Sequence, residues 1–221
     1  MYIAIEGVIG VGKTTLARLL QPSFNAVLLL EIFEENPFLS DFYEDRERYA
    51  FQTQMFFLLS RYHQQRRKVP EMITQSDYLL SDYTFDKDSL FARINLKGDE
   101  LDMYYRVHQA LAEKIIAPDL IVYLQASTDV LMQRIAFRDR HYERNMEWEY
   151  IDELNQVYEQ FFTEHNQHPT KILAIDTDDL NYVTNKAKLE FVENRIRQAL
   201  RVPPYQTELL LELSEKKRGA T

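Results

Sequence analysis

The sequence has no cysteine and only one tryptophan among its 221 residues. Without cysteine the chain forms neither disulfides nor thiolate metal sites, a composition expected of a protein in a reducing compartment. No apolar stretch approaches the roughly 20 residues that span a bilayer. No basic segment precedes an apolar one at the N-terminus, as it does in a signal peptide. We therefore expect a cytoplasmic protein with no membrane partner.

Positive charge is also scarce. The chain has 26 Lys and Arg residues against 35 Asp and Glu residues, which gives a net charge of −9. Polymeric nucleic acid is bound through broad surfaces that neutralise many phosphates, so this balance argues against a DNA or RNA partner. A small phosphorylated ligand needs only a few local cations and is compatible with the composition.

The length and composition fit one compact domain. A chain of 221 residues with 45% hydrophobic residues buries a substantial core without a second domain. We place this domain at residues 1–202 and a C-terminal tail at residues 203–221. The tail begins with Pro203-Pro204, and it is either a docked helix over Glu208–Ser214 or a frayed end.

Short apolar runs alternate with longer segments of helical spacing. Five runs have the length of strands buried in a parallel sheet, namely Tyr2–Glu6, Ala26–Leu30, Tyr78–Ser81, Leu120–Leu124 and Lys171–Ile175. Helices are expected at Lys13–Leu20, Arg46–Lys68, Asp86–Ala92, Glu100–Ile116, Asp129–Arg138, Tyr150–His165 and Thr184–Leu200. This alternation predicts a single α/β domain with a five-stranded parallel sheet and right-handed crossovers.

Glycine is rare, and three of the 5 glycines lie at positions 7, 10 and 12. Residues 7–14 fit the pattern G-x-x-x-x-G-K-[ST], with a strand before the loop and a helix after it. In such a loop successive backbone N–H groups and the start of the helix surround phosphate oxygens. The pattern predicts an ATP site made by Gly7, Val8, Ile9, Gly10, Val11, Gly12, Lys13, Thr14 and Thr15. Lys13 would reach the β- and γ-phosphates, and the Thr14 hydroxyl would hold Mg²⁺.

Glu31 follows the second predicted strand. Carboxyl ends of parallel strands open into the crevice where ligands bind, so Glu31 is well placed to accept a proton from an attacking hydroxyl. The alternative is a solvated carboxylate in an acidic loop with Glu34 and Glu35. Position alone does not decide between these two interpretations.

Arginine is concentrated in one segment of this acidic chain. Arg134, Arg138, Arg140 and Arg144 lie within eleven residues, and the first two share a helix face. Guanidinium groups bind phosphoryl oxygens in pairs, so the segment can close as a lid over a triphosphate. The alternative is a solvated helix end. Beside a phosphate loop we favour the lid, because electrostatics and positioning dominate phosphoryl transfer.

Several blocks, taken together in order, resemble the deoxynucleoside kinases from position 1 to about 200. The blocks are Ile5-Glu6-Gly7, Glu31-Ile32 (usually Glu-Pro in the family), Phe42-Tyr43-Glu44, Phe51–Gln54, Leu59-Ser60-Arg61, Arg134–Glu143 and Ile175–Asp179. The resemblance implies a P-loop kinase fold with an Arg-rich lid. It also implies transfer of the ATP γ-phosphate to a deoxynucleoside 5′-hydroxyl, with Mg²⁺ bound, in a homodimer formed through helical segments that include residues 55–59 and 101–116.

The same resemblance implies residue roles. Glu31 would be the general base, Tyr43 and Glu143 would hold the 3′-hydroxyl, and Gln54 with Arg61 would bind the base. Arg134, Arg138 and Arg140 would contact phosphates, and Asp179 and Leu180 fall near the loop that covers the adenine of ATP. Tyr43 and Gln54 are eleven residues apart, or three helical turns, which would let both face one cleft.

The main departure from the family pattern follows the third strand. The family usually has Glu-Arg-Ser where this chain has Ser81-Asp82-Tyr83. We expect Asp82 to serve Mg²⁺, directly or through water. Lys87 would replace the missing cation, with Arg93 a weaker candidate. Residues 85–92 resemble a bacterial branch that acts on purine deoxynucleosides, especially deoxyadenosine, although Lys87 also lies near where some members read the base.

Two other functions compete with this interpretation. A nucleoside monophosphate kinase of the thymidylate type shares the loop and lid but needs cations for the acceptor phosphate. The segment at residues 32–37 is acidic and apolar and argues against one. A non-catalytic nucleotide-binding subunit is the second alternative, and the intact Lys13, Thr14, Glu31 and lid argue against it.

Overall fold

The computed structural model describes residues 1–32, 35–164 and 170–203. The predicted tail lies outside the described residues beyond Pro203, as does His165 at the end of one predicted helix. In the described part of the chain no helix is long and apolar enough to cross a membrane.

The core of the fold is a five-stranded sheet in which every pairing is parallel, as the sequence predicts. The strands are β1 (Tyr2–Glu6), β2 (Val27–Leu29), β3 (Leu79–Ser81), β4 (Leu120–Gln125) and β5 (Lys171–Asp176), in the order β2-β3-β1-β4-β5. β1 is wholly buried between β3 and β4, because its apolar residues are covered on both faces. The carboxyl end of β1 leads directly into the phosphate loop, at the centre of the sheet.

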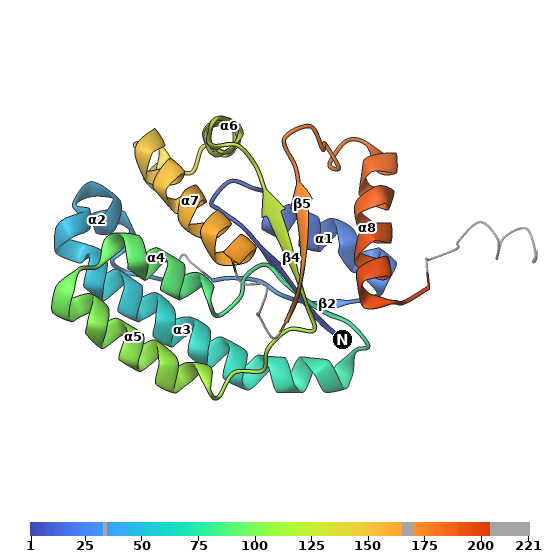
Figure 1. The fold of residues 1–221 in the computed structure, drawn as a ribbon, viewed down its shortest axis with the longest axis horizontal. Coiled ribbons are helices and arrows are strands. Elements are labelled where there is room, and N and C mark those ends of the chain that lie inside the picture. Colours follow the sequence, from blue (N-terminus) through green and yellow to red (C-terminus); the bar gives the residue numbers. More distant parts are fainter. Residues whose placement is uncertain (33–34, 165–169, 204–221) are drawn as a thin grey trace, which may run out of the picture.

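Helices cover both faces of this sheet (Figure 1). They are α1 (Lys13–Phe24), α2 (Leu39–Glu44), α3 (Arg46–Gln75), α4 (Lys87–Asn95), α5 (Gly98–Ala112), α6 (Thr128–Arg138), α7 (Trp148–Glu164) and α8 (Lys186–Leu200), with a 3₁₀ turn η1 (His141–Glu143). In Figure 1, α1 and α8 stand on one side of the strands and α3, α4, α5 and α7 on the other. The predicted α/β architecture is therefore confirmed.

The segment between Tyr43 and Gln54 differs from the prediction. The chain breaks at Asp45, whose carboxylate caps α3 by accepting the backbone N–H of Arg48 at 3.2 Å. Tyr43 thus lies on α2 and Gln54 on α3, and the argument from three turns of one helix was wrong.

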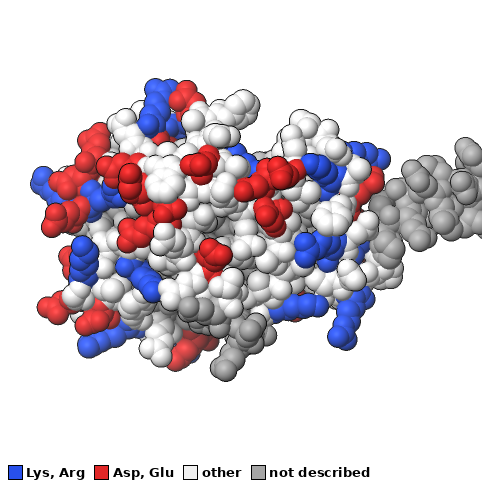
Figure 2. All heavy atoms as spheres, turned by 45° about the horizontal axis from the view of Figure 1, so that its top comes forward, with Lys and Arg blue, Asp and Glu red and all other residues white. Residues whose placement is uncertain are grey.

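Two apolar clusters matter for the site. The larger one surrounds β1 and β4 and includes residues of α1, α6, α7 and α8. A second cluster joins α2, α3, α4 and α5 around Leu58, Phe85 and Tyr104. The helices that carry several predicted substrate residues are therefore packed chiefly among themselves. In Figure 2 acidic side chains predominate over the middle of the visible face, in keeping with the net charge of −9.

Candidate active site

A cavity opens at the carboxyl ends of β1, β2 and β3, where the sequence places its candidate residues. It is lined by Ile9, Gly10, Lys13, Thr14, Glu31, Tyr43, Gln54, Phe57, Arg61, Asp82, Lys87, Arg138, Arg140, Tyr142 and Glu143, among others. Residues that lie far apart in the sequence thus meet in one place.

The phosphate loop has the conformation that its glycines permit. Gly7 has a φ of +148°, and a Cβ at this position would lie 2.5 Å from the carbonyl oxygen of Leu124. α1 begins at Lys13, whose Nζ donates to the carbonyl oxygens of Gly7 at 2.6 Å and Val8 at 3.1 Å. Burial and then the nearby Lys87 lower the pKa of the Lys13 ammonium to about 8. A half-buried cation therefore lies against the loop that is expected to hold phosphates.

Asp82 joins the loop to the second strand. One of its carboxylate oxygens accepts the hydroxyl of Thr14, and the other accepts the backbone N–H of Glu31 at 2.8 Å. A hydroxyl beside a carboxylate is an oxygen donor set that suits Mg²⁺. In the described ranges no three His, Cys, Asp or Glu side chains cluster for a metal. Nucleotide phosphates and water would thus have to complete a Mg²⁺ site at Thr14 and Asp82.

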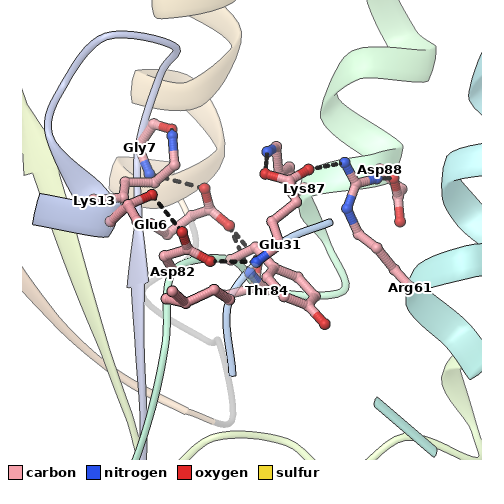
Figure 3. A network of polar contacts seen from close by, with 12 residues as sticks. Glu6, Gly7, Lys13, Glu31, Arg61, Asp82, Thr84, Lys87 and Asp88 are labelled. Carbon is pink, nitrogen blue, oxygen red and sulfur yellow. Dashed lines mark hydrogen bonds and ion pairs between the residues drawn. The ribbon is translucent and has the colours of Figure 1, made fainter. Parts of the chain in front are cut away.

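Glu31 is held between two cations (Figure 3). One carboxylate oxygen pairs with Arg61, and the other lies 2.5 Å from Nζ of Lys87. Only 13% of the Glu31 side chain is exposed, so the alternative of a solvated carboxylate was wrong. Burial alone would raise the pKa of this carboxyl, but Lys87 and Arg61 outweigh burial and hold the pKa far below its usual range.

Arg61 has a second carboxylate partner that the sequence analysis missed. Asp88, on the first turn of α4, is 1% exposed and forms an ion pair with the Arg61 guanidinium. The available signal was an acidic residue directly beside Lys87, at the start of the predicted helix. Arg61 therefore bridges Glu31 and Asp88, while Arg93 is exposed, binds Gln160 at 2.9 Å and does not line the cavity.

The opposite wall of the cavity carries the predicted sugar and base residues. Gln54 is 2% exposed, and its side-chain amide has no hydrogen-bond partner among the residues that the structure describes. The ring of Tyr43 stacks on that of Tyr142, with 6.0 Å between centroids and 17° between planes. Tyr142 was not predicted, because its place in the cavity wall depends on contact between η1 and α2.

The arginine segment divides into parts with different neighbours. Glu143 is buried and accepts hydrogen bonds from Arg138 at 2.6 Å and Arg140 at 3.5 Å, and all three line the cavity. Arg134 instead donates to Thr177, at 2.9 Å to its hydroxyl and 2.6 Å to its carbonyl. Arg144 pairs with Asp139 at the surface and does not line the cavity.

Arg134 lines a second groove on the other side of the phosphate loop. The groove is formed by Gly10, Val11, Gly12, Thr15, Val130, Gln133, Arg134, Phe137, Arg138, Asp178, Leu180, Asn181, Tyr182, Val183 and Thr184. Leu180 lines this groove, and its place near the adenine of ATP stays a prediction. Asp179 does not line the groove, and its carbonyl accepts Nζ of Lys188. The two hollows flank one loop, which is the arrangement that two reacting ligands require.

Comparisons with known proteins identify a family and several relatives. The model of the deoxynucleoside kinase family matches residues 3–201. Deoxyguanosine kinase of Bacillus subtilis (strain 168) is 32% identical over 201 residues, covering 90% of this chain and 97% of the relative. Deoxyadenosine kinase of Dictyostelium discoideum is 36% identical over 165 residues, covering 72% of this chain and 66% of the relative.

A solved structure shares the fold. Deoxyadenosine kinase from M. mycoides with bound dCTP superposes with a TM-score of 0.76 at 24% sequence identity, covering 90% of this chain and all of that one. The family match spans the sheet, the phosphate loop and the arginine segment. On this evidence the chain belongs to the deoxynucleoside kinase family.

Proposed function

We propose that the chain transfers the γ-phosphate of ATP to the 5′-hydroxyl of a purine deoxynucleoside, with deoxyadenosine favoured, in nucleotide salvage. The observation that carries this proposal is one cavity in which Glu31, Lys87 and the Thr14–Asp82 pair face the unpaired amide of Gln54. Reacting groups and a base-reading group are thus assembled on a single acceptor site. The family match disfavours both a thymidylate-type kinase and a non-catalytic subunit.

The deoxynucleoside, which accepts the phosphoryl group, would be held by residues that line the cavity. Tyr43 and Glu143 would bind the 3′-hydroxyl, which turns the 5′-hydroxyl toward Glu31. The Glu31 carboxylate would accept the 5′-hydroxyl proton as the O5′–P bond forms and the bond from Pγ to the bridging oxygen of ADP breaks. For this to happen Glu31 must give up one of its two cations.

Lys87 is the cation that can change partners. Its Nζ lies 2.5 Å from Glu31, and its charge is close enough to Lys13 to lower the pKa of that ammonium. Lys87 would leave Glu31 for the transferring phosphoryl group, replacing the Arg of the usual family motif, while Arg61 stays anchored by Asp88. The proton acceptor is thereby freed only when a triphosphate is present.

ATP, the phosphate donor, would lie between the phosphate loop and the arginine segment. Lys13 and the loop N–H groups would hold its phosphates, and Arg134 is fixed at the second groove by Thr177. Arg138 and Arg140 would contact the transferring group from the lid. Mg²⁺, when bound, would neutralise phosphate charge, and Thr14 and Asp82 would hold it.

The base preference rests on Gln54. A carboxamide offers one acceptor and two donors, which match the amine and the adjacent ring nitrogen of adenine. Arginine pairs better with guanine, but the guanidinium of Arg61 is already engaged by Glu31 and Asp88. Gln54 is therefore the group available to read the base, which favours deoxyadenosine.

A coupled assay of ADP release with the four deoxynucleosides and with dTMP tests the proposal. We expect the highest kcat/KM for deoxyadenosine. With dTMP we expect no ADP release above background. Turnover of none of the deoxynucleosides would refute the activity. A higher kcat/KM for deoxyguanosine would refute only the role given to Gln54.

We also propose that two copies associate through the outer faces of α3 and α5, as the sequence resemblance implies. Leu58 is buried in the second cluster and Phe57 lines the cavity, so these are already used within one chain. Leu59 and Met103 remain 42% and 52% exposed. Light scattering should give the mass of a dimer, and Leu59→Glu should give that of a monomer. A monomeric parent protein would contradict this assembly.

A further inference from the structure

Glu6 is a buried carboxylate to which the mechanism above assigns no task. It is the last residue of β1, is 0% exposed, and stands in the Ile5-Glu6-Gly7 block that precedes the phosphate loop. Within the described ranges it forms no ion pair with Lys or Arg. A carboxylate in such surroundings is costly unless its oxygens receive several hydrogen bonds.

Four donors surround this carboxylate. Oε1 accepts the backbone N–H of Gly7 at 2.9 Å and the hydroxyl of Tyr158 at 3.3 Å. Oε2 accepts the backbone N–H of Thr84 at 2.7 Å and its hydroxyl at 2.9 Å. A backbone N–H can only donate, so each oxygen of Glu6 accepts at least one hydrogen bond.

The two backbone donors belong to the two segments that the reaction must bring together. Gly7 opens the phosphate loop that holds the donor. Thr84 lies between Asp82 and Lys87, which serve the metal and the transferring group in the proposed mechanism. Figure 3 shows Glu6 with Gly7 and Thr84 as its hydrogen-bonded neighbours.

No strand pairing performs this task. The pairing between β1 and β3 ends at Ala4 and Ser81, so the two strands separate where the cavity opens. Beyond that point the Glu6 carboxylate bonds to both of the diverging segments. Tyr158 on α7 contacts it from a third element.

We propose that Glu6 is a positioning residue for phosphoryl transfer, fixing the phosphate loop relative to the segment that carries Asp82 and Lys87. The inference rests on the proposed kinase function. Misplacement of reacting groups by about 1 Å can cost on the order of 10²-fold in rate. A shift of either segment would separate Lys87 from the donor while leaving the nucleoside walls on α2, α3 and η1 in place.

Glu6→Gln tests this role with little change in size. The amide replaces one acceptor oxygen by an NH₂ group, so in either orientation the backbone N–H of Gly7 or of Thr84 faces a donor. At a temperature where circular dichroism shows the variant folded, we expect kcat to fall by about 10- to 100-fold. The KM for the deoxynucleoside should stay within about twofold, because its walls are not displaced.

Two further variants complete the test. Tyr158→Phe removes only the 3.3 Å bond and keeps both backbone tethers, so kcat should stay within about threefold. Thr84→Val removes the 2.9 Å hydroxyl bond, one of the two bonds by which the Thr84 segment holds Glu6, and serves if Glu6→Gln does not fold. We expect a loss of about 3- to 10-fold in kcat at unchanged KM.

The outcomes separate this inference from the function on which it depends. An active parent protein with parental kcat in folded Glu6→Gln, or in Thr84→Val if the former does not fold, would overturn the positioning role alone. A rise of about 10- to 100-fold in the KM for the deoxynucleoside, with kcat unchanged, would also overturn it. A parent protein inactive on every deoxynucleoside would overturn the proposed function and this inference with it.

Discussion

Replacing Lys87 with methionine removes a buried cation while keeping most of the length of the side chain. In the structure this cation lies 2.5 Å from a Glu31 oxygen and is 7% exposed. Two roles predict opposite results. If Lys87 only restrains the proton acceptor, its removal frees Glu31 and raises kcat. If Lys87 moves to the transferring phosphoryl group, its removal lowers kcat.

The size of the loss follows from electrostatics. An ammonium about 4 Å from a phosphoryl oxygen, with an effective dielectric constant of about 20, contributes about 4 kcal/mol. A change of about 1.4 kcal/mol alters a rate tenfold. Part of this attraction already exists in the bound triphosphate, so we expect Lys87→Met to lower kcat by about 10²–10³. The deoxynucleoside KM should change little, since Gln54, Tyr43 and Glu143 remain.

Single-turnover transfer from labelled ATP, with both substrates saturating, measures the chemical step directly. Lys87→Arg is the matched control, because it keeps a cation on α4 and should retain more activity than the methionine variant. Thermal unfolding shows whether either variant is folded. An unchanged or higher rate in folded Lys87→Met would refute the exchange of partners.

Four further changes test other parts of the site and fold. Glu31→Gln should lower kcat by about 10²–10⁴ if this carboxylate is the general base, and a parental kcat would exclude that role. Asp82→Asn should raise the Mg²⁺ concentration needed for half-maximal rate, whereas an unchanged titration would count against a metal role. Phe137→Ala removes a 93% exposed ring from the rim of the second groove and should raise the KM for ATP at unchanged nucleoside KM; no rise would separate this ring from the donor. Burial lowers the pKa of His108 in the folded chain, so the unfolded chain binds more protons as the pH falls below about 6.5, and stability is lost there. His108→Phe should therefore lose less stability in urea titrations between pH 7 and pH 5 than the parent, and equal losses would contradict this.

The sheet could be predicted well because each strand is a short, largely apolar run, and β1, β3 and β4 are buried along almost their whole length. All five predicted strands begin and end within one residue of the observed bounds, and the phosphate loop follows β1 as its pattern requires. The start of α3 at Arg46 was predicted at the observed residue, whereas the short helix α2 before it was not predicted. In the folded chain Asp45 separates the two helices, and its carboxylate accepts the backbone N–H of Arg48.

Contacts between distant segments limited the prediction of the site. Asp88 becomes part of it because α4 packs on α3, which brings its carboxylate to Arg61. The arginines were grouped by sequence spacing alone. α6 ends at Asp139, which has a φ of +49°, so Arg144 does not continue the helix face that carries Arg134. The phosphate loop and Glu31 were predicted from a motif and a strand position, and Gln54 from the family resemblance, and all of them line the cavity.

The cavity lies at the seam between two separately packed cores. The phosphate loop and α1 contribute apolar residues to the larger core, whereas α3, which carries Gln54 and Arg61, contributes Leu58 and Tyr62 to the core of α2, α3, α4 and α5. Substitutions within the smaller core can reshape the base-reading wall without touching the packing beneath the loop. Selection or engineering can thus alter which nucleoside is accepted while the phosphate-transferring half is inherited unchanged.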